Sequence, residues 1–284
     1  MNLILAALPS PPFEAIHIGS IQLRAYGLMI ALGVLAAVWL AEKRWMVRGG
    51  GEGDIQSLAA WAVPAGVVGA RLYHVVTNYE GYRGRPLRIL QVWHGGLGIP
   101  GGIMVGVLTG LIVARQRKLR VSVLLDSIAP ALPLAQAIGR WGNWFNQELF
   151  GKPTSLPWGV HIDVAHRPAE YATSATFHPT FLYESLWNLA LVGVILYADR
   201  RHADHSGRLF ALYLAGYASG RFWIERMRID FAHTIGGLRV NEWMSIVVFA
   251  GSMLYLALDT RRRRTRGSGD SQPVTVSVSP SRHN

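Results

Sequence analysis

The chain has 284 residues, of which 50% are hydrophobic and only 16% are charged, and its mean hydropathy is positive at +0.22. In soluble domains about a quarter of all residues are usually charged, so the composition argues against an ordinary soluble protein. The chain contains no cysteine, which excludes disulfides, thiolate metal sites and a cysteine nucleophile.

Long apolar blocks recur along the chain, each close to the roughly 20 residues that cross about 30 Å of hydrocarbon. Most of them lack an amphipathic stripe, which disfavours a soluble all-α protein with buried core helices. We therefore expect an all-α polytopic membrane protein with about seven transmembrane helices and a polar central cavity. The expected spans are residues 23–41, 57–76, 95–114, 121–138, 180–198, 209–224 and 243–258.

The net charge of +11 is concentrated in alternate connections between these spans. The segments "EKRWMVR", "RQRKLR", "DRRHADHSGR" and "DTRRRRTR" hold 15 of the 28 Lys and Arg residues. Short cytoplasmic loops are enriched in basic residues, so we expect an outside N-terminus and a cytoplasmic C-terminus in a bacterial plasma (inner) membrane. The basic runs are then topology signals and contacts with anionic lipid, and no nucleic acid is expected as a partner.

Two regions differ in composition from the expected spans: one is an insertion within the membrane domain, which we place at residues 1–260, and the other follows that domain. The polar insertion 152–177 is expected to form a small external cap. The segment 261–284 is basic, then rich in Ser, Pro and Gly, and is expected to be a disordered cytoplasmic tail. The N-terminal "MNLILAALPS" has an apolar core too short for a cleaved signal peptide and no basic residue before it.

The fourth and sixth expected spans each place polar side chains on one helix face, namely Gln136, Arg140 and Asn143 in the former and Tyr217, Arg221, Glu225 and Arg228 in the latter. An arginine near the bilayer centre costs about 3 kcal/mol on insertion scales. Snorkelling to the headgroups would lower that cost for Arg140 and Arg228, and an internal pair with Glu225 would lower it for Arg221. We favour a shared cavity, because the planar guanidinium fork suits a phospholipid phosphate at that depth.

Several other polar residues have more than one interpretation. Tyr26, early in the first span, is either an interfacial tyrosine or part of the cavity. Arg71 and His74 end the second span, where we expect Arg71 to snorkel. Asp126 is expected to pair with nearby basic residues, and His178, before a proline, to be a structural hydrogen-bonding group. The exposed "HADH" segment, 202–205, is not expected to bind metal.

A specific resemblance emerges from "GRWGNWFNQELFG", residues 139–151. This segment resembles the signature of bacterial prolipoprotein diacylglyceryl transferase. Supporting blocks follow the family's order along the chain, from about residue 26 to residue 258. They are "YGLM" at 26–29, "HGGLGIPGG" at 94–102, "HPTFLYE" at 178–184 and "YASGRFWIERMRID" at 217–230.

The resemblance implies an enzyme that moves diacylglycerol from phosphatidylglycerol to the lipobox cysteine of a preprolipoprotein. The products would be a thioether and glycerol phosphate, with no metal or cofactor. Expected partners are phosphatidylglycerol, lipobox-containing preprolipoproteins and the lipid bilayer. The implied catalytic residues are Tyr26, Arg140, Glu148, Arg221 and Glu225. The implied substrate-binding residues are Asn143, Asn146, Gly151, Tyr217, Gly95, Gly96, Gly101, Gly102 and His178.

One position departs from the family pattern. Many members have a histidine just before the second Gly-Gly pair of the third block, and this chain has Pro100 there. A histidine at that site therefore cannot act as the thiol base. We expect that His94, six residues earlier, does not replace it. Six residues of chain separate the two positions, so the His94 ring would reach the same point only if this segment folded back on itself.

Three other classes of protein were considered as alternatives. A lipid or solute transporter would show broken helices in two repeat-related halves, and no internal repeat is evident. A non-catalytic membrane scaffold would not need inward-facing arginine stripes. An intramembrane hydrolase is disfavoured because no nucleophile motif is present.

Overall fold

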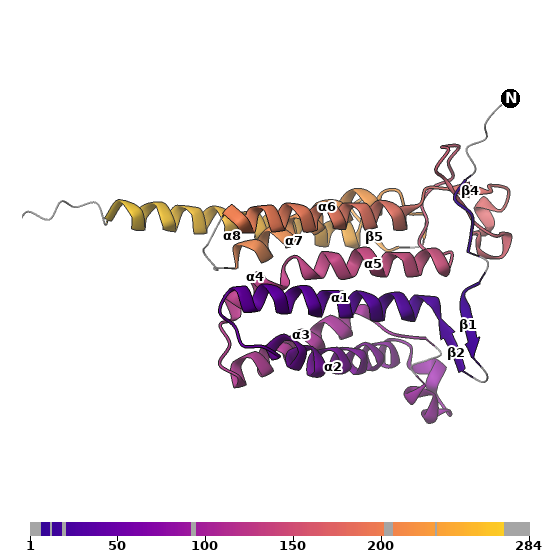
Figure 1. The fold of residues 1–284 in the computed structure, drawn as a ribbon. Helices are drawn as coiled ribbons and strands as arrows, with labels where there is room; N and C mark the ends of the chain where they lie inside the picture. The colour runs from indigo at the N-terminus through magenta and orange to yellow at the C-terminus, as the bar shows by residue number, and fades with distance from the viewer. Residues whose placement is uncertain are drawn as a thin grey trace, which may run out of the picture.

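The computed structural model describes residues 7–11, 13–18, 21–91, 95–201, 207–230 and 232–269. Long helices run side by side through the molecule, and short strands and turns gather at one end of the bundle (Figure 1). The helices are α1 Ala25–Val47, α2 Asp54–Thr77, α3 Ile99–Gln116, α4 Val121–Ile128, α5 Ala131–Phe145, α6 Thr180–Arg201, α7 Arg208–Glu225 and α8 Val240–Gly269.

Within the described residues, six helical segments are long and apolar enough to cross a membrane: α1, α2, α3, the combined α4–α5 segment, α6 and the first 22 residues of α8. Large apolar side chains on them are exposed, for example Leu35 at 66% and Val76 at 77%. Such surfaces are stable against hydrocarbon rather than water. The protein is therefore a multi-pass membrane protein, as predicted. The sixth expected span, residues 209–224, corresponds to α7, a helix of 18 residues that carries the charged residues Arg208, Arg221 and Glu225.

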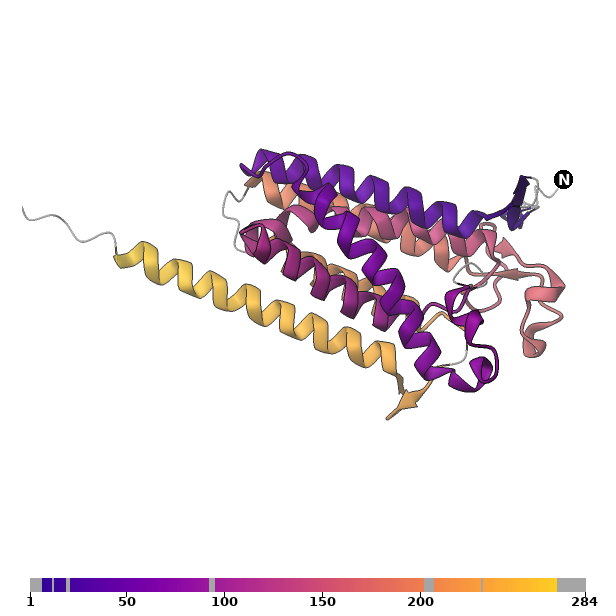
Figure 2. The ribbon, with the colours of Figure 1, turned by 90° about the horizontal axis from the view of Figure 1, so that it is seen from below.

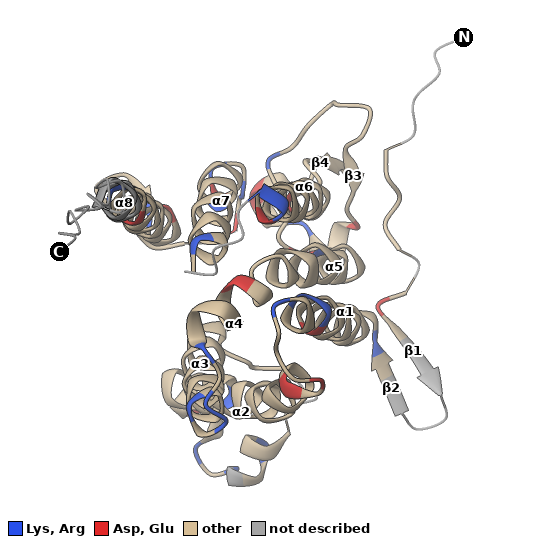
Figure 3. Ribbon diagram, turned by 60° about the vertical axis from the view of Figure 1, so that its left-hand side comes forward, with Lys and Arg blue, Asp and Glu red and all other residues tan. Residues whose placement is uncertain are grey.

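The helices form a row in which each packs against the next, in the order α3, α2, α1, α5, α6, α7, α8. Figure 3 shows this row end-on, with the α2–α3 pair set to one side of α1. Glycines allow α2 and α3 to approach closely: a Cβ at Gly69 would lie 2.6 Å from the Gly101 carbonyl oxygen. Small residues at such contacts are typical of helix packing in membranes.

The fourth expected span is divided in the structure. α4 ends at Ile128, and α5 begins at Ala131 after Pro130, whose missing N–H cannot continue a helical hydrogen-bond ladder. α5 then extends to Phe145, seven residues beyond the expected end at residue 138. This extension keeps Arg140 and Asn143 on a helix.

In the part of the chain that the structure describes, three two-stranded antiparallel pairs lie at the strand-bearing end of the bundle: β1 Ala15–Ile18 with β2 Ile21–Arg24, β3 Val160–His161 with β4 Thr176–Phe177, and β5 Thr234–Ile235 with β6 Leu238–Arg239. The first pair leads into α1 and the third into α8. Short 3₁₀ turns lie here too, among them Tyr79–Tyr82, Pro86–Leu90, Val164–His166 and Ala169–Tyr171.

The insertion 152–177 forms a compact cap, as expected. It shares an apolar cluster with the ends of the helices, built from Phe150, Val160, Ile162, Phe177 and Phe181. Within the signature, Gln147 ties the cap to the bundle: its Nε2 donates to Asp163 Oδ2 at 2.7 Å, and its Oε1 accepts from the Asp163 backbone N–H at 2.8 Å.

The opposite end of the bundle carries the basic connections, some of them paired with carboxylates. Asp199 on α6 accepts from Arg48 at 2.7 Å and also pairs with Arg44, both near the end of α1. The charge of the basic residue Arg48 acts on Asp126, as expected. The Asp126 carboxylate also accepts from the backbone N–H groups of Gly207, Leu209 and Phe210 at 2.9–3.2 Å, because the first N–H groups of α7 have no partner within the helix.

Past the membrane core, α8 continues to Gly269. The start of the tail expected to be disordered, residues 261–269, is therefore helical, and residues 270–284 lie outside the described part of the chain. Seen from below, α8 diverges from the other helices toward its C-terminal end (Figure 2).

Candidate active site

Arg140 and Arg221, predicted to share a cavity, are joined through a third side chain. Glu184, one turn into α6, lies between α5 and α7. Its Oε2 is 2.5 Å from Arg140 Nε and its Oε1 is 3.9 Å from Arg221 Nη1. Glu184 lies within "HPTFLYE" and was assigned no role from the sequence, although a carboxylate in an apolar span is itself a sign of a functional site.

Glu225, the last residue of α7, is 1% exposed and receives three partners. Arg221 Nη2 lies 2.7 Å from its Oε2, which is the internal pair considered from the sequence. Arg239, at the end of β6, approaches Oε1 at 3.2 Å, and Asn241 Nδ2 donates to the same oxygen at 3.1 Å. Arg239 and Asn241 were not predicted from the sequence, because they lie at the end of β6 and in the first turn of α8 rather than on a polar stripe.

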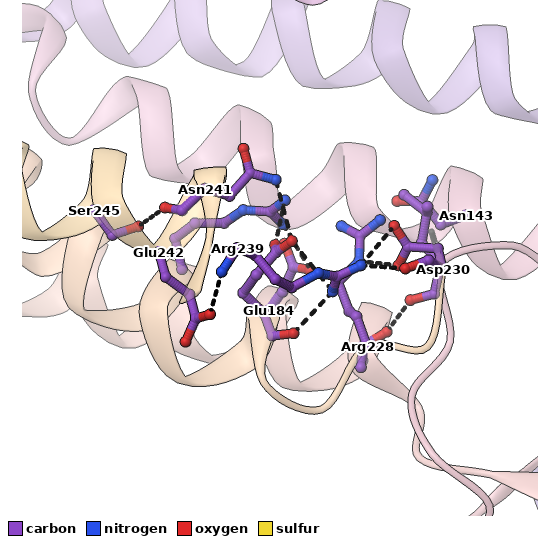
Figure 4. A network of polar contacts seen from close by, with 12 residues as sticks. Asn143, Glu184, Arg228, Asp230, Arg239, Asn241, Glu242 and Ser245 are labelled. Carbon is purple, nitrogen blue, oxygen red and sulfur yellow. Dashed lines mark hydrogen bonds and ion pairs between the residues drawn. The ribbon is translucent and has the colours of Figure 1, made fainter. Parts of the chain in front are cut away.

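The network continues into the loop between α7 and β5 (Figure 4). Arg228 Nε lies 2.6 Å from Asp230 Oδ1, and Arg239 Nη2 lies 3.4 Å from Asp230 Oδ2. Burial alone would raise the pKa of Asp230, but the hydrogen bond and charge of Arg228 and the charge of Arg239 outweigh it and hold that pKa below its usual value. Arg228 is thus paired inside the protein, with only 7% of its side chain exposed.

We call these connected ion pairs the arginine–carboxylate group: Arg140, Arg221, Arg228, Arg239, Glu184, Glu225 and Asp230. Four guanidinium groups face three carboxylates in these ion pairs, and a fourth carboxylate, Glu148, is joined to Arg140 through Asn143. Pairing of this kind offsets the desolvation of buried charges. The planar guanidinium forks suit the oxygens of an anion such as a phosphodiester.

A second set of polar contacts is built by the signature itself. Asn143 Nδ2 and Asn146 Nδ2 donate to Glu148 Oε1 at 2.8 and 3.2 Å. Arg140 Nη1 donates to Asn143 Oδ1 at 3.4 Å, which connects this set to the arginine–carboxylate group. The turn contains Gln147 and Leu149 with positive φ of 49° and 58°, a strained conformation for residues other than glycine that is enriched at functional sites.

Tyr26 lies beside this set at the start of α1. Its ring packs on Gly142, where a Cβ would come within 2.6 Å of Tyr26 Cδ2. The charges of Glu148 and Arg140 both act on the Tyr26 hydroxyl. The structure therefore brings Tyr26, Arg140, Asn143, Asn146 and Glu148 into one region, and their catalytic and binding roles remain predictions.

The other predicted substrate-binding residues lie around this region. Tyr217 stacks on Tyr213 with ring centroids 5.9 Å apart. The Gly151 N–H donates to the His178 carbonyl oxygen at 2.9 Å, and a Cβ at Gly151 would lie 2.9 Å from His178 Cβ. His178 Nδ1 lies 3.2 Å from the Tyr183 hydroxyl, in line with the structural interpretation of this histidine.

The glycine-rich loop before α3 is organised by Arg71. The expectation that Arg71 snorkels is wrong: it is 6% exposed, and its guanidinium donates to five carbonyl oxygens. Those oxygens belong to Arg88, Ile89, Gln91, Gly95 and Gly96. Hydrogen bonds to loop carbonyls replace the headgroup water that snorkelling would supply.

Gly95 and Gly96, with φ of 87° and 77°, line a cavity of about 460 Å³ together with His74 and Asn78. The lining of this cavity does not include Arg140 or Arg221. Gly101 and Gly102 lie on α3 and pack against α2. Pro100 is in the first turn of α3, and His94 lies outside the described residues.

Comparison with known proteins identifies the family. The sequence model of the family described as prolipoprotein diacylglyceryl transferase matches residues 14–258. The chain belongs to this family. Among members of the prolipoprotein diacylglyceryl transferase family, it is 51% identical to phosphatidylglycerol–prolipoprotein diacylglyceryl transferase 2 of Streptomyces coelicolor, over 96% of this chain and 92% of that protein. It is 47% identical to the corresponding transferase of Cutibacterium acnes, over 93% and 89%. The family predicted from the signature is thus confirmed.

Metal binding was not expected from the sequence. Within the described residues, no group of three or more His, Asp or Glu side chains is placed to hold a metal ion. The carboxylates of the candidate site are instead engaged by arginines and amides.

Proposed function

We propose that this chain transfers diacylglycerol from phosphatidylglycerol to the lipobox cysteine of preprolipoproteins and releases glycerol phosphate. The observation that carries the proposal is the arginine–carboxylate group, in which Arg140 and Arg221 both pair with Glu184, in a chain of this family. The two guanidinium forks would bind the phosphodiester of phosphatidylglycerol.

The proposed reaction forms a carbon–sulfur bond at the glycerol carbon that bears the phosphate and breaks the carbon–oxygen bond to that phosphate. Negative charge then grows on the leaving glycerol phosphate. Arg140 and Arg221 would stabilise it, because preorganised donors in a water-poor site act most strongly where charge develops. Glu184 holds the two guanidinium groups toward each other before the lipid arrives.

The attacking group would be the cysteine thiolate. A thiol with a pKa near 8.5 is only a few per cent ionised at pH 7, which corresponds to a cost of about 2 kcal/mol. The positive potential of the arginines would lower that pKa. The thiol proton would leave with solvent or with the glycerol phosphate, so the step needs no histidine at Pro100.

The proposed orientation places the strand-bearing end of the bundle and the candidate site outside the cytoplasm of a bacterial inner membrane. The basic connections lie at the opposite end, as expected for the cytoplasmic side. An exported preprolipoprotein and an outer-leaflet headgroup would then meet at the ends of α5, α6 and α7.

Purified protein incubated with phosphatidylglycerol and a lipobox peptide tests the proposal. We expect glycerol phosphate release together with a peptide that gains the mass of diacylglycerol. A peptide with serine in place of the cysteine is the matched control and is expected to give neither product. Absence of both products with the cysteine peptide and a correctly folded enzyme would show that the proposal is wrong.

A further inference from the structure

The first segment that the structure describes, residues 7–11, lies against the cap as an added strand. Leu8 pairs in parallel with Val160 of β3. Its N–H donates to the Gly159 carbonyl oxygen at 2.8 Å, and its carbonyl oxygen accepts from the His161 N–H at 2.9 Å. β4 pairs with the other edge of β3. Without residues 7–11, this edge would present an unpaired donor and acceptor, an arrangement that binds extended peptides.

Two further contacts enclose the segment. The indole N–H of Trp144 donates to the Pro9 carbonyl oxygen at 3.1 Å, and Ser10 Oγ donates to the His161 carbonyl oxygen. We call the edge of β3 at residues 159–161, together with Trp144, the strand slot. Apart from the indole, the slot holds the segment through backbone groups, which every extended chain can match. Its hydrogen bonds therefore do not require the sequence of residues 7–11.

The side chains of the segment add one apolar contact. Leu8 packs against the buried cluster of the cap that contains Val160 and Phe177. Pro9, the next residue, is exposed. An extended peptide with an apolar side chain at the place of Leu8 would thus make the same contacts as the protein's own segment.

The strand slot adjoins the family signature. Ser10 lines the same small crevice as Asn143, Trp144 and Glu148. Asn143 Oδ1 in turn accepts from Arg140 Nη1 at 3.4 Å. A chain in the slot therefore lies next to side chains that are in contact with the proposed phosphate site, which is where the thiol of the second substrate has to arrive.

We propose that the strand slot receives the extended segment of the preprolipoprotein beside its lipobox cysteine, and that residues 7–11 give way to it. The inference rests on the proposed function and adds to it the docking place of the protein substrate. An exported chain that has not yet folded offers the backbone N–H and carbonyl groups that the slot pairs with. Because the two segments compete, residues 7–11 lower the apparent affinity for the substrate peptide by the fraction of slots that are open.

Peptide kinetics test this competition. Leu8→Pro removes the N–H that donates to Gly159. Ala7→Pro, the matched control, places the same ring one residue earlier, where the N–H has no partner among the described residues. We expect Leu8→Pro to lower KM for a lipobox peptide about fivefold relative to Ala7→Pro, the size expected for one lost hydrogen bond. KM for phosphatidylglycerol is expected to differ by less than about twofold. A peptide KM that is equal or higher in Leu8→Pro would overturn the inference.

Photo-crosslinking of the wild-type protein gives a second test, which does not depend on the folding of a variant. The probe is a lipobox peptide with serine in place of the cysteine and a benzophenone beside that serine. We expect mass spectrometry to place the crosslinks on residues 159–161 and Trp144, and an excess of unlabelled peptide to remove them. Crosslinks at other segments only, or none, would overturn the inference. Crosslinks at residues 159–161 in an enzyme that transfers no diacylglycerol to the cysteine peptide would support the docking place and refute the proposed function.

Discussion

Glu184 shows how one side chain can set the geometry of two others. Its two carboxylate oxygens point to arginines on different helices, so the spacing of Arg140 and Arg221 depends on it. It is 5% exposed, and a buried carboxylate in such a place is stable only while its partners remain charged. We interpret Glu184 as a positioning residue for the proposed phosphate site.

Replacing Glu184 with glutamine is expected to lower kcat/KM about 10- to 100-fold, because charge-assisted hydrogen bonds of about 1.5–3 kcal/mol are lost. The amide keeps the shape of the side chain but no longer attracts both guanidinium groups. Lipid-transfer kinetics measure the effect, with Glu80→Gln in an exposed turn as the control. An E184Q enzyme with wild-type kcat/KM would rule out the positioning role.

The absence of a histidine at Pro100 leads to a prediction about His94. General-base catalysis is usually worth 10²–10⁴-fold. We expect His94→Ala to keep at least about a tenth of the activity, which is a smaller loss than removal of a general base would cause. Tyr26→Phe, Arg140→Ala and Arg221→Ala are expected to lose far more. Activity assays on folded, inserted protein provide the measurement. If His94→Ala is as inactive as the arginine variants, His94 is the base and this interpretation is wrong.

At the scale of elements, α7 depends on a carboxylate from another helix. Asp126 on α4 is fully buried and accepts from three backbone N–H groups at the start of α7. The contact lies at the end of the bundle opposite the arginine–carboxylate group, so its loss should act through the stability of α7 rather than through the lipid phosphate.

Asp126→Ala is expected to destabilise the protein by about 1–2 kcal/mol, the usual cost of losing a helix N-cap. For a chain of this size the corresponding fall in Tm is about 2–8 °C. Thermal unfolding in detergent measures it, with Glu52→Ala in the exposed loop before α2 as the control. A Tm equal to that of the control would mean that the cap does not stabilise α7.

The polar stripes predicted part of this arrangement. Helical spacing placed Arg140 with Asn143 and Arg221 with Glu225 on single faces, and the helices that carry them do lie on either side of α6. Glu184 could not be assigned in the same way, because one carboxylate in an apolar span has no periodic partner. Only the packing of α6 between α5 and α7 reveals what it binds.

Two sets of contacts could not be predicted, for a common physical reason. Arg71 was expected to reach the headgroups and Asp126 to pair with basic residues, yet both bind backbone groups of segments distant in sequence. Backbone carbonyl and N–H groups are present at every position, so no sequence pattern marks those that a buried side chain will reach. The strand pairs before α1 and α8 were missed because each has only two to four residues per strand.

At the scale of the whole molecule, apolar surface and basic charge are separated. Exposed apolar side chains cover the helices, and the basic ends of α1, α3 and α6 lie at the end opposite the candidate site. The arrangement predicts a cytoplasmic C-terminus. A topology reporter fused after Arg266 is expected to be active in the cytoplasm only. Activity solely on the outer face would mean that the number of spans is wrong by an odd number.

The central claim is that Arg140 and Arg221 hold the phosphate of phosphatidylglycerol, and turnover of the lysine variants tests it most directly. Arg140→Lys and Arg221→Lys keep the charge and lose the planar fork. With the exposed Arg83→Lys as control, we predict that each lowers the rate of glycerol phosphate release about 30- to 1,000-fold, as expected for a loss of about 2–4 kcal/mol. Near-normal rates for both lysine variants, at normal expression, would contradict the account.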